Sequence, residues 1–346
     1  MTIKEIREHS GLSQGEFCKR YGIPKGTLCH WESGERKPPL YVLSLLEKVV
    51  KQDKKKNKKV EIWGRILLGN FCKNDCKMCG LQRGNRFVKR YRMDMDHILR
   101  LCHDFDAQGV KGFVLESGND PLLGEEKIAE IILAIHSHHP KTKIILALGE
   151  KNEGAYLHWK TVGAVGYLLA HGSANENHFK KIYPANTSFL LKKQHQWQLR
   201  NIEYLLGDEL LVGIPYQTVK DVVDDLRYMK EQGVNIIDIR TFMPALHTVF
   251  ERERSGNGDM AIYIMAIMRL MLPNAYILAD PVLECVKKNG RVQALEAGAD
   301  VLLVDAPEAD ILSSYCVYQR KSGRTQLGFD DLNQLKMQIQ EKGFQF

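Results

Sequence analysis

The chain has 346 residues, of which 44% are hydrophobic and 26% are charged. This length suits two domains with a sizeable core. No apolar run reaches the roughly 18 residues that cross a membrane, and the N-terminus lacks the apolar segment of a secretory signal. The sequence therefore predicts a cytoplasmic protein with no membrane partner, whose eight cysteines stay reduced.

The positive charge is concentrated at the N-terminus. Residues 1–60 hold 14 Lys and Arg against 7 Asp and Glu, whereas the rest of the chain holds 35 of each. Such asymmetry is typical of a segment that binds an anion such as nucleic acid, and a solvated basic face is the alternative. The lysine-rich stretch 51–61 predicts an exposed linker or helix end that divides the chain into residues 1–50 and 62–346.

Residues 1–50 predict a small all-α domain of short helices. Ser13 and Glu16 form a capping-box pattern at the start of one helix, and Pro24 opens the next, which ends at Gly34. A helix, a glycine turn and a second helix have helix-turn-helix spacing. The segments LSQGEF, YGIPKGTL and WESGERKPP resemble the Xre/Cro-type helix-turn-helix family.

This spacing predicts a surface for double-stranded DNA. The first turns of a recognition helix read bases in the major groove, and flanking polar side chains meet phosphates. Base contacts are expected from Lys25, Gly26, Thr27 and His30, and phosphate contacts from Gln14, Arg36 and Lys37. Cys18 and Cys29 occupy apolar helix positions and are expected in the core. A helical domain that contacts another protein is the alternative.

Residues 62–346 alternate eight short apolar runs with helical stretches. The runs are IWGRILL, GFVLES, KIILAL, GYLLA, LLVGIP, NIIDIR, AYILAD and VLLVDA. Continuous apolar runs are typical of buried parallel strands. Eight such units predict an α/β fold, a TIM-type (βα)8 barrel with its site at the carboxyl ends of the strands. An open doubly wound sheet is the alternative.

Three cysteines follow the first run. Cys72, Cys76 and Cys79 have the spacing C-x3-C-x2-C, with no fourth nearby. A structural zinc site uses four ligands, whereas an iron–sulfur cluster held by three thiolates keeps one iron open. Three unrelated thiols are the alternative. The loop resembles that of the radical S-adenosylmethionine (SAM) superfamily, which implies a [4Fe-4S] cluster, bound SAM, and an electron donor such as flavodoxin or ferredoxin.

The resemblance narrows to the subgroup that contains the hydrogenase maturase HydE, methylornithine synthase and biotin synthase. It extends from about residue 62 to 308 and includes CKNDCKMCGLQRGN, FVLESGNDP, HGSANENHFKKIYP and GIPYQT. It implies hydrogen abstraction from a small, amino-acid-like substrate. The positions that match the subgroup's SAM-binding residues are Gly118, Asn119, Asp120, Glu150, Lys192, Val212, Gly213, Pro215, Phe242 and Met243.

The chain also departs from the maturase. It reads Ala170-His171-Gly172 where the maturase has Arg-His-Glu, and Ala279-Asp280 where the maturase has two threonines. These departures argue against the maturase's substrate. Arg240 and Asp280 end consecutive runs, so they are expected either to anchor a carboxylate and an ammonium or to pair with each other. His171 is expected to be a substrate ligand or a structural histidine.

The sequence therefore predicts a radical SAM enzyme fused to a DNA-binding domain. Its predicted partners are a small-molecule substrate, DNA, an electron donor and a second copy of the chain. The alternative is a transcription regulator whose barrel senses SAM, redox state or a metabolite.

Overall fold

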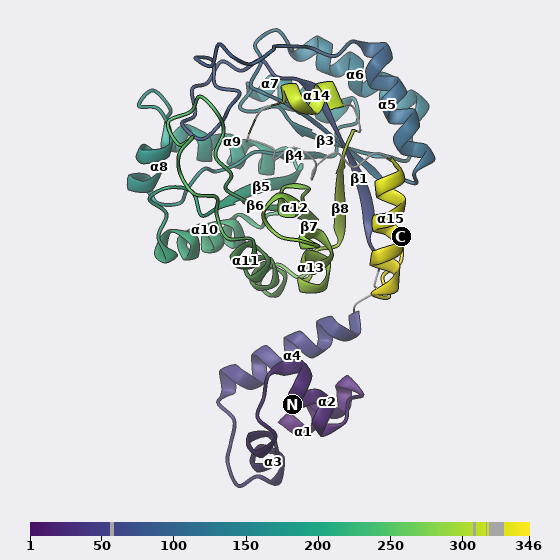
Figure 1. Ribbon diagram of the computed structural model, residues 1–346, viewed down its shortest axis with the longest axis vertical. Coiled ribbons are helices and arrows are strands. Elements are labelled where there is room, and N and C mark those ends of the chain that lie inside the picture. Colours follow the sequence, from purple (N-terminus) through teal and green to yellow (C-terminus); the bar gives the residue numbers. More distant parts are fainter. Residues whose placement is uncertain (56–58, 307–308, 316, 318–328) are drawn as a thin grey trace. The chain divides into compact units, whose positions relative to one another are not determined.

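The computed structural model describes residues 1–55, 59–306, 309–315, 317 and 329–346. The chain forms two compact units, Met1–Lys59 and Val60–Phe346. Figure 1 shows that the first unit is helical and the second is a barrel with surrounding helices. Within the described ranges, no helix has both the length and the apolar character needed to cross a membrane.

The first unit is built from short capped helices. Ser13 accepts a hydrogen bond from the backbone of Glu16, whose side chain bonds back to the Ser13 backbone, so the predicted capping box is present. Gly22, with φ 65°, ends one helix in the left-handed conformation and turns the chain into the next. The helices are α1 Ile3–Ser10, α2 Gln14–Tyr21, α3 Lys25–Ser33 and α4 Leu40–Lys55.

A compact apolar core holds these helices together. It contains Phe17 and Leu28, both 0% exposed. Cys18 packs against this core, as expected, but Cys29 is exposed and the expectation for Cys29 is wrong. Consecutive residues of an α-helix point about 100° apart, so the inward orientation of Leu28 turns its neighbour outward.

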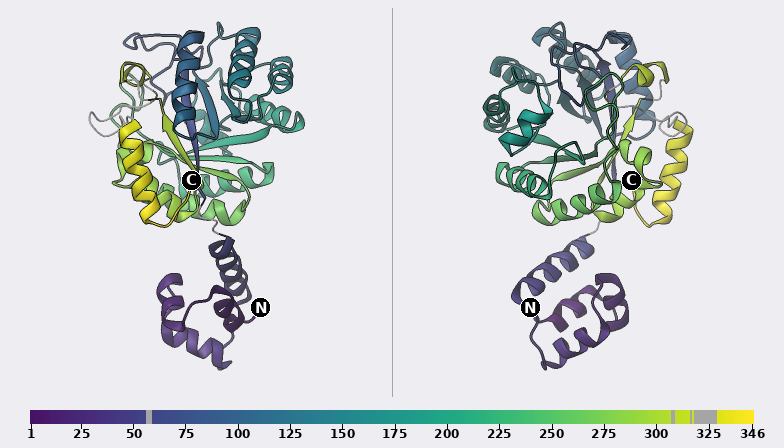
Figure 2. Two further views of the ribbon diagram at one scale, coloured as in Figure 1. Left: turned by 90° about the vertical axis from the view of Figure 1, so that its right-hand side faces the viewer. Right: turned by 60° about the vertical axis from the view of Figure 1, so that its left-hand side comes forward.

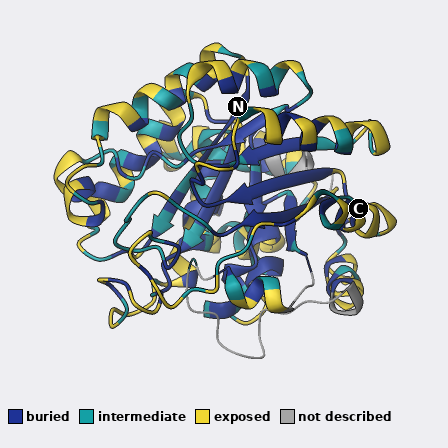
Figure 3. Ribbon diagram, turned by 90° about the horizontal axis from the view of Figure 1, so that it is seen from above, coloured by how far each residue is buried: buried dark blue, intermediate teal, exposed yellow. Residues whose placement is uncertain are grey.

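The second unit is a closed barrel of parallel strands in the order β1 to β8, which confirms the predicted fold. Most strand residues are buried, and Figure 3 draws the strands largely dark blue. This two-sided burial explains why the strands read as continuous apolar runs. They are β1 Glu61–Gly69, β2 Gly112–Ser117, β3 Lys143–Ala147, β4 Gly166–Leu168, β5 Leu205–Val212, β6 Ile236–Thr241, β7 Tyr276–Ala279 and β8 Val301–Asp305.

Helices surround the strands, as Figures 1 and 2 show. Cys102 is buried in the first of them, as its apolar position predicts. The helices are α5 Met95–Ala107, α6 Glu125–His138, α7 Glu153–Thr161, α8 Glu176–Ile182, α9 Phe189–Asn201, α10 Val219–Gln232, α11 Gly258–Met271, α12 Val282–Val286, α13 Gly290–Ala297, α14 Ala309–Ser314 and α15 Phe329–Glu341.

Strand β5 differs from its predicted position. The apolar run LLVGIP predicts a strand over 210–215, whereas β5 begins at Leu205 and ends at Val212. Asp208 and Glu209 interrupt the apolar pattern, although both side chains point to buried polar groups. The charged residues break the apolar pattern, so the sequence does not indicate where this strand begins.

The interior of the barrel changes from apolar to charged along the strands. A buried cluster includes Trp63, Val114, Ile236, Leu278 and Leu303. Side chains two residues apart on a strand share one face. Two residues beyond each of these lies a charged side chain, so an ionic layer follows the apolar layer toward the carboxyl ends. The charged residues are Arg65, Glu116, Asp238, Asp280 and Asp305.

A buried histidine joins the segment after β4 to β5 and α10. His171 is 0% exposed, and its Nδ1 lies 2.9 Å from Asp208 Oδ2 while its Nε2 lies 3.1 Å from Asp225 Oδ1. Burial by itself lowers the pKa of His171, but Asp208 and then Asp225 outweigh burial and raise that pKa to about 9.

We expect this ion group to stabilise the barrel in a pH-dependent way. Because the folded pKa lies above the ordinary value of 6.5, the stabilisation is complete below pH 6.5 and is lost as the pH rises to about 9. The difference in unfolding free energy between wild type and His171→Gln should shrink by up to about 3 kcal/mol over this range. Urea unfolding at several pH values measures it, with exposed His136→Gln as the control. A constant difference would contradict the assignment.

Candidate active site

A cavity of about 240 Å³ lies at the carboxyl ends of the strands, where a barrel places its active site. One wall carries the three cysteines of the loop after β1. Apolar side chains such as Leu211, Ile214 and Phe242 line much of the rest. Glu116 of the ionic layer also reaches its lining, together with Glu209 and Arg240, which pair with each other and extend this layer.

The cysteines fit the predicted cluster. Cys72, Cys76 and Cys79 all line the same cavity, so the fold brings the three sulfur donors together. Burial raises the pKa of the Cys76 thiol to about 12. A bound metal ion stabilises the thiolate and so opposes this effect of burial. The described residues of the lining include no fourth cysteine, and Cys316 lies outside the described part of the chain. Three sulfur donors match the protein ligands of a cluster with one open iron.

Arg90 fastens the cysteine loop, a role that the sequence analysis missed. Its guanidinium donates hydrogen bonds to four backbone carbonyls that flank the cysteines. The acceptors are Asn70 at 2.5 Å, Leu81 at 3.0 Å, Gln82 at 2.8 Å and Asn85 at 3.2 Å. A lysine offers no comparable planar set of donors. The available signal was the basic KRYRM segment soon after the cysteines.

Asn70 ties the same loop to two distant segments. It is 0% exposed, donates to the carbonyls of Lys89 and Ser314, and accepts a hydrogen bond from the Tyr91 backbone. Gly118 allows the end of β2 to approach the loop. A Cβ added at Gly118 would lie 2.3 Å from the carbonyl oxygen of Phe71, a separation that no side chain tolerates.

The residues expected to bind SAM separate into three sets. Those that line the 240 Å³ cavity are Gly118, Phe242 and Met243. Those that line a second cavity of about 680 Å³ are Asn119, Glu150 and Lys192. Those outside both linings are Asp120, Val212, Gly213 and Pro215.

The second set forms one hydrogen-bonded group beside the cysteine loop. Lys192 Nζ lies 2.6 Å from Glu150 Oε1, and Asn119 Nδ2 donates to Glu150 Oε2 at 3.1 Å. Burial opposes ionisation of Glu150, but Lys192 outweighs burial and lowers the pKa of Glu150 to about 2. The Lys73 backbone N–H donates to the Asn119 carbonyl, which joins this group to the loop.

Asp120 and Gly213 have structural contacts. Asp120 is 0% exposed and pairs with Arg92 at 2.6 Å, and Arg92 lies over the Phe71 ring. Gly213 has φ 82°, and an added Cβ would lie 2.5 Å from Gly256 Cα. Both residues therefore shape the strand ends rather than the cavity lining.

Arg240 is surrounded by carboxylates. Its Nε lies 2.7 Å from Asp238 and 3.4 Å from Asp280, its Nη1 lies 3.1 Å from Glu209, and its Nη2 lies 3.5 Å from Glu116. Each nitrogen of the guanidinium thus faces an acidic side chain.

Arg65 forms the second centre of this ionic layer. It is 3% exposed and contacts Asp305 at 2.6 Å and Asp280 at 2.9 Å, and it lies 3.6 Å from Glu116. Asp280 is 0% exposed and lies outside the cavity lining. Of the two alternatives for Arg240 and Asp280, the geometry favours mutual pairing within a larger network.

His171 also lies outside the cavity lining. Its neighbours Ala170 and Gly172 reach the cavity, while its own ring turns to Asp208 and Asp225. Both ring nitrogens have partners, which favours the structural alternative for this histidine.

The first unit presents the residues expected to contact DNA in two ways. Lys25, Gly26 and His30 on α3 are exposed, as are Arg36 and Lys37, while Thr27 is half-buried. Gln14 instead donates to Glu32 Oε2 at 2.6 Å. His30 pairs with Glu35. The exposed residues thus lie on α3 and on the segment that comes after it.

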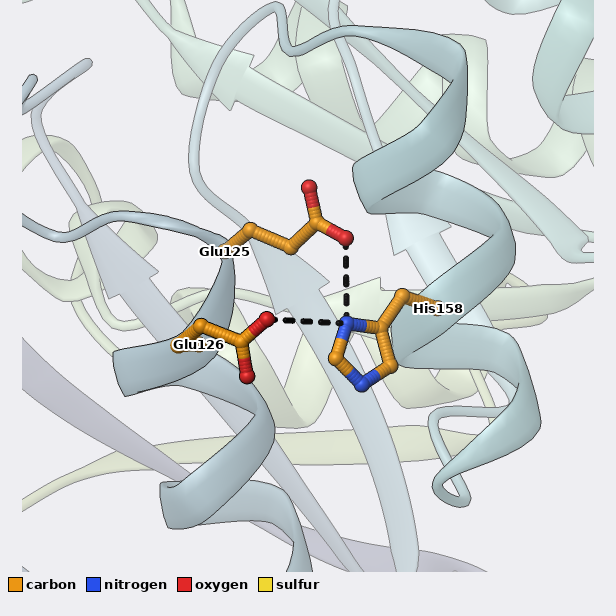
Figure 4. A group of neighbouring side chains, drawn as sticks. All are labelled: Glu125, Glu126 and His158. Atoms are coloured by element: carbon orange, nitrogen blue, oxygen red, sulfur yellow. Dashed lines mark hydrogen bonds and ion pairs between the residues drawn. The ribbon is translucent and has the colours of Figure 1, made fainter.

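A group of potential metal ligands lies outside the lining of the 240 Å³ cavity, although Glu125 lines the second one. Figure 4 shows Glu125 and Glu126 directed at His158. The Nδ1 atom of His158 lies 3.0 Å from Glu125 and 4.0 Å from Glu126. The two glutamates occupy the first turn of α6, where the helix dipole favours acidic side chains. Ion pairing with the histidine accounts for this group without a metal.

We expect Arg90→Met to leave the barrel folded and to reduce cluster incorporation several-fold, because four carbonyls around the cysteines lose their donor. Iron content and visible absorption after anaerobic reconstitution measure the effect. Arg252→Met is the control, since Arg252 is 95% exposed and its ion pair is with Glu251, outside the cysteine loop. Full cluster occupancy in Arg90→Met would show that Arg90 is not needed to hold the cysteine loop.

The comparisons with known proteins agree with this architecture. Residues 3–51 match the family described as helix-turn-helix. The fold resembles the crystal structure of methylornithine synthase, with a TM-score of 0.76 and 19% identity over 99% of this chain and 93% of that one. It also resembles a crystal structure of the hydrogenase maturase HydG, with a TM-score of 0.72 and 14% identity over 99% of this chain and 78% of that one.

Curated relatives match the barrel by sequence. A 3-methylornithine synthase of Methanosarcina acetivorans is 24% identical over 74% of this chain and 72% of its own length. The [FeFe] hydrogenase maturase subunit HydE of Thermotoga maritima is 32% identical over 76% of this chain and 74% of its own length. The chain therefore belongs to the radical SAM enzymes, in the group of HydE, methylornithine synthase and biotin synthase, and carries an N-terminal helix-turn-helix domain.

Proposed function

We propose that the barrel is a radical SAM enzyme that acts on a small molecule in the cavity between the cysteine loop and the ionic layer. The observation that carries this proposal is the meeting of three thiols at one strand-end cavity. A [4Fe-4S] cluster and SAM bound there supply the one-electron cleavage of SAM that begins hydrogen abstraction.

The chain's own residues hold and shelter these groups in this proposal. Cys72, Cys76 and Cys79 would hold the cluster, and the apolar wall around Phe242 and Met243 would keep water from the reacting atoms. We propose that a further set of residues, at positions that match the subgroup's SAM-binding residues, contacts SAM from the two cavities and the strand ends around them. This set is Gly118, Asn119, Asp120, Glu150, Lys192, Val212, Gly213 and Pro215.

The polar group beside the loop suits the methionine part of SAM. Glu150 and the Asn119 amide oxygen are acceptors for an ammonium, and Lys192 is a donor for a carboxylate. A flavodoxin or ferredoxin would deliver the electron. Reduced thiols and a reduced cluster call for a reducing compartment, so we propose a cytoplasmic location.

The activities of the relatives do not select a substrate. Their names describe a hydrogenase maturase subunit, a 3-methylornithine synthase and a biotin synthase, which are three different activities. The chain also has Ala170 and Gly172 where the maturase has an arginine and a glutamate. We therefore propose a reaction of this class without adopting any one relative's substrate.

We propose that the first unit binds double-stranded DNA through α3. Lys25, Gly26, Thr27 and His30 would face base edges, and Arg36 and Lys37 would face phosphates. Gln14 enters this proposal only if it leaves Glu32. The support is the exposed set of basic residues on α3 and the segment after it, together with the excess of positive charge within residues 1–60.

The fusion of the two units favours a second candidate, a transcription regulator in which the barrel senses SAM, redox state or a metabolite. The two candidates differ in turnover. An enzyme forms many 5′-deoxyadenosine molecules per chain, whereas a sensor binds SAM and changes DNA affinity with little or no cleavage.

The cluster proposal predicts iron and SAM cleavage. Anaerobically reconstituted protein should hold about four irons per chain, and with a reductant should convert SAM to methionine and 5′-deoxyadenosine. The triple variant Cys72→Ala, Cys76→Ala, Cys79→Ala should lose both properties, because no ligand set remains. Cys29→Ala, at an exposed site in the first unit, is the control. Iron retained by the triple variant would refute the assignment.

The DNA proposal predicts that some residues contact phosphates and others contact bases. Binding measured at several salt concentrations, on a duplex selected from a random pool and on a scrambled duplex, separates the two roles. Lys37→Ala should weaken binding to the selected and the scrambled duplex alike. It should also lower the slope of log affinity against log salt concentration by about one, as expected for a phosphate contact. Lys25→Ala should cost about 1–3 kcal/mol on the selected duplex only. Lys127→Ala, on an exposed face of the barrel, is the control. Equal effects of all three variants would disprove this division.

A further inference from the structure

The floor of the 240 Å³ cavity carries an acidic side chain with an unused acceptor. Glu116 is 7% exposed and lines the cavity. Its Oε1 accepts a hydrogen bond from the Tyr315 hydroxyl at 3.1 Å. Its Oε2 has no hydrogen-bond donor among the described residues and lies 3.5 Å from Arg240 and 3.6 Å from Arg65. Both guanidinium groups lie within ion-pair distance of Oε2, but neither donates a hydrogen bond to it, so this atom can still accept one from a ligand.

The charges around Glu116 are unequal. Two guanidinium groups, Arg65 and Arg240, face five carboxylates in the described part of the network. A third buried guanidinium, Arg291, interacts with Asp280 and Asp305, but it pairs with a further carboxylate, Glu284, at 3.7 Å. Because every nitrogen of Arg240 already faces a carboxylate, Arg240 offers little to a substrate carboxylate. Buried negative charge needs compensation by a proton or a cation. The lining of the cavity therefore favours a cationic ligand over an anionic one.

We propose that the substrate carries a positively charged amine, and that this ammonium binds at Glu116 and Glu209 on the cavity floor. The inference rests on the proposed function, because it names the substrate class of that same cavity. An ammonium has three donors, which suit Glu116 Oε2 together with the Glu209 carboxylate. Arg240 is then a positioning residue: it holds the two carboxylates and does not grip the substrate.

The protonation of the network agrees with this assignment. Burial, reinforced by Asp280 and Glu209 and opposed by Arg240 and Arg65, raises the pKa of Asp238 to about 8. Burial likewise raises the pKa of Glu209. At neutral pH the network thus retains protons in the absence of a ligand. A bound ammonium lowers these pKa values, so its arrival releases protons and its affinity rises from pH 6 to pH 8.

Three probes of equal size test the proposal on full-length protein loaded with cluster and SAM. They are n-butylamine, n-butanol and butyrate, which share a four-carbon skeleton and end in an ammonium, a neutral hydroxyl and a carboxylate. Anaerobic calorimetry should show n-butylamine binding at least tenfold more tightly than n-butanol, with no detectable binding of butyrate. Titrations in phosphate and in Tris should differ in heat because protons are released.

Two variants locate the site. Glu116→Gln and Glu209→Gln should each weaken n-butylamine binding by about 10- to 100-fold, the range for a lost charge-assisted hydrogen bond. The affinity for n-butanol should stay unchanged. Glu130→Gln, at an exposed outer helix, is the matched control. If Glu116→Gln fails to fold, Glu209→Gln still decides, since the Glu209 side chain is 22% exposed and tolerates change better.

Several results would overturn the inference. These are tighter binding of butyrate than of n-butylamine, unchanged n-butylamine affinity in the folded Glu116→Gln or Glu209→Gln variants, or displacement of n-butylamine by millimolar Mg²⁺ as the preferred occupant. None of these readouts needs turnover. Absence of SAM cleavage would count against the proposed function alone, while the binding titrations decide the substrate class.

Discussion

The ionic layer inside the barrel is the interaction on which the site depends. Arg65 from β1 and Arg240 from β6 bind carboxylates that come from other strands or follow them directly. A buried charge is tolerated only where its partners are in place, so each contact fixes the position of two strand ends. The loop with the cysteines begins a few residues after Arg65, and its starting point is therefore set by this network.

Side chains two residues apart on a strand share one face, so the ionic layer lies directly above the apolar layer and forms the floor of the cavity. Trp63 and Leu303 belong to the apolar layer, and Arg65 and Asp305 follow them two residues later on the same face. Apolar residues fill the inner end of the barrel, and the charged side chains support the cavity above them. The cysteine loop then forms the wall, held by Arg90 and Asn70.

Sequence patterns predicted those parts of the molecule that depend on local spacing. The apolar runs located most strands, and the C-x3-C-x2-C spacing located the cysteine loop. The ionic layer was not predictable in the same way, because Arg65 and Asp305 lie 240 positions apart and only the closed barrel joins them. Asp208 misled the prediction of β5 for the same reason, since its partner His171 belongs to another segment.

The two units use charge in opposite physical settings. The basic residues of α3 and the segment after it lie in water, where attraction to phosphate comes largely from counterion release and weakens as salt rises. The carboxylates of the barrel lie in a buried layer, where salt screens them far less and where protonation adjusts the balance. If both units bind as proposed, ionic strength should act mainly on DNA binding by the first unit and pH mainly on ligand binding in the cavity.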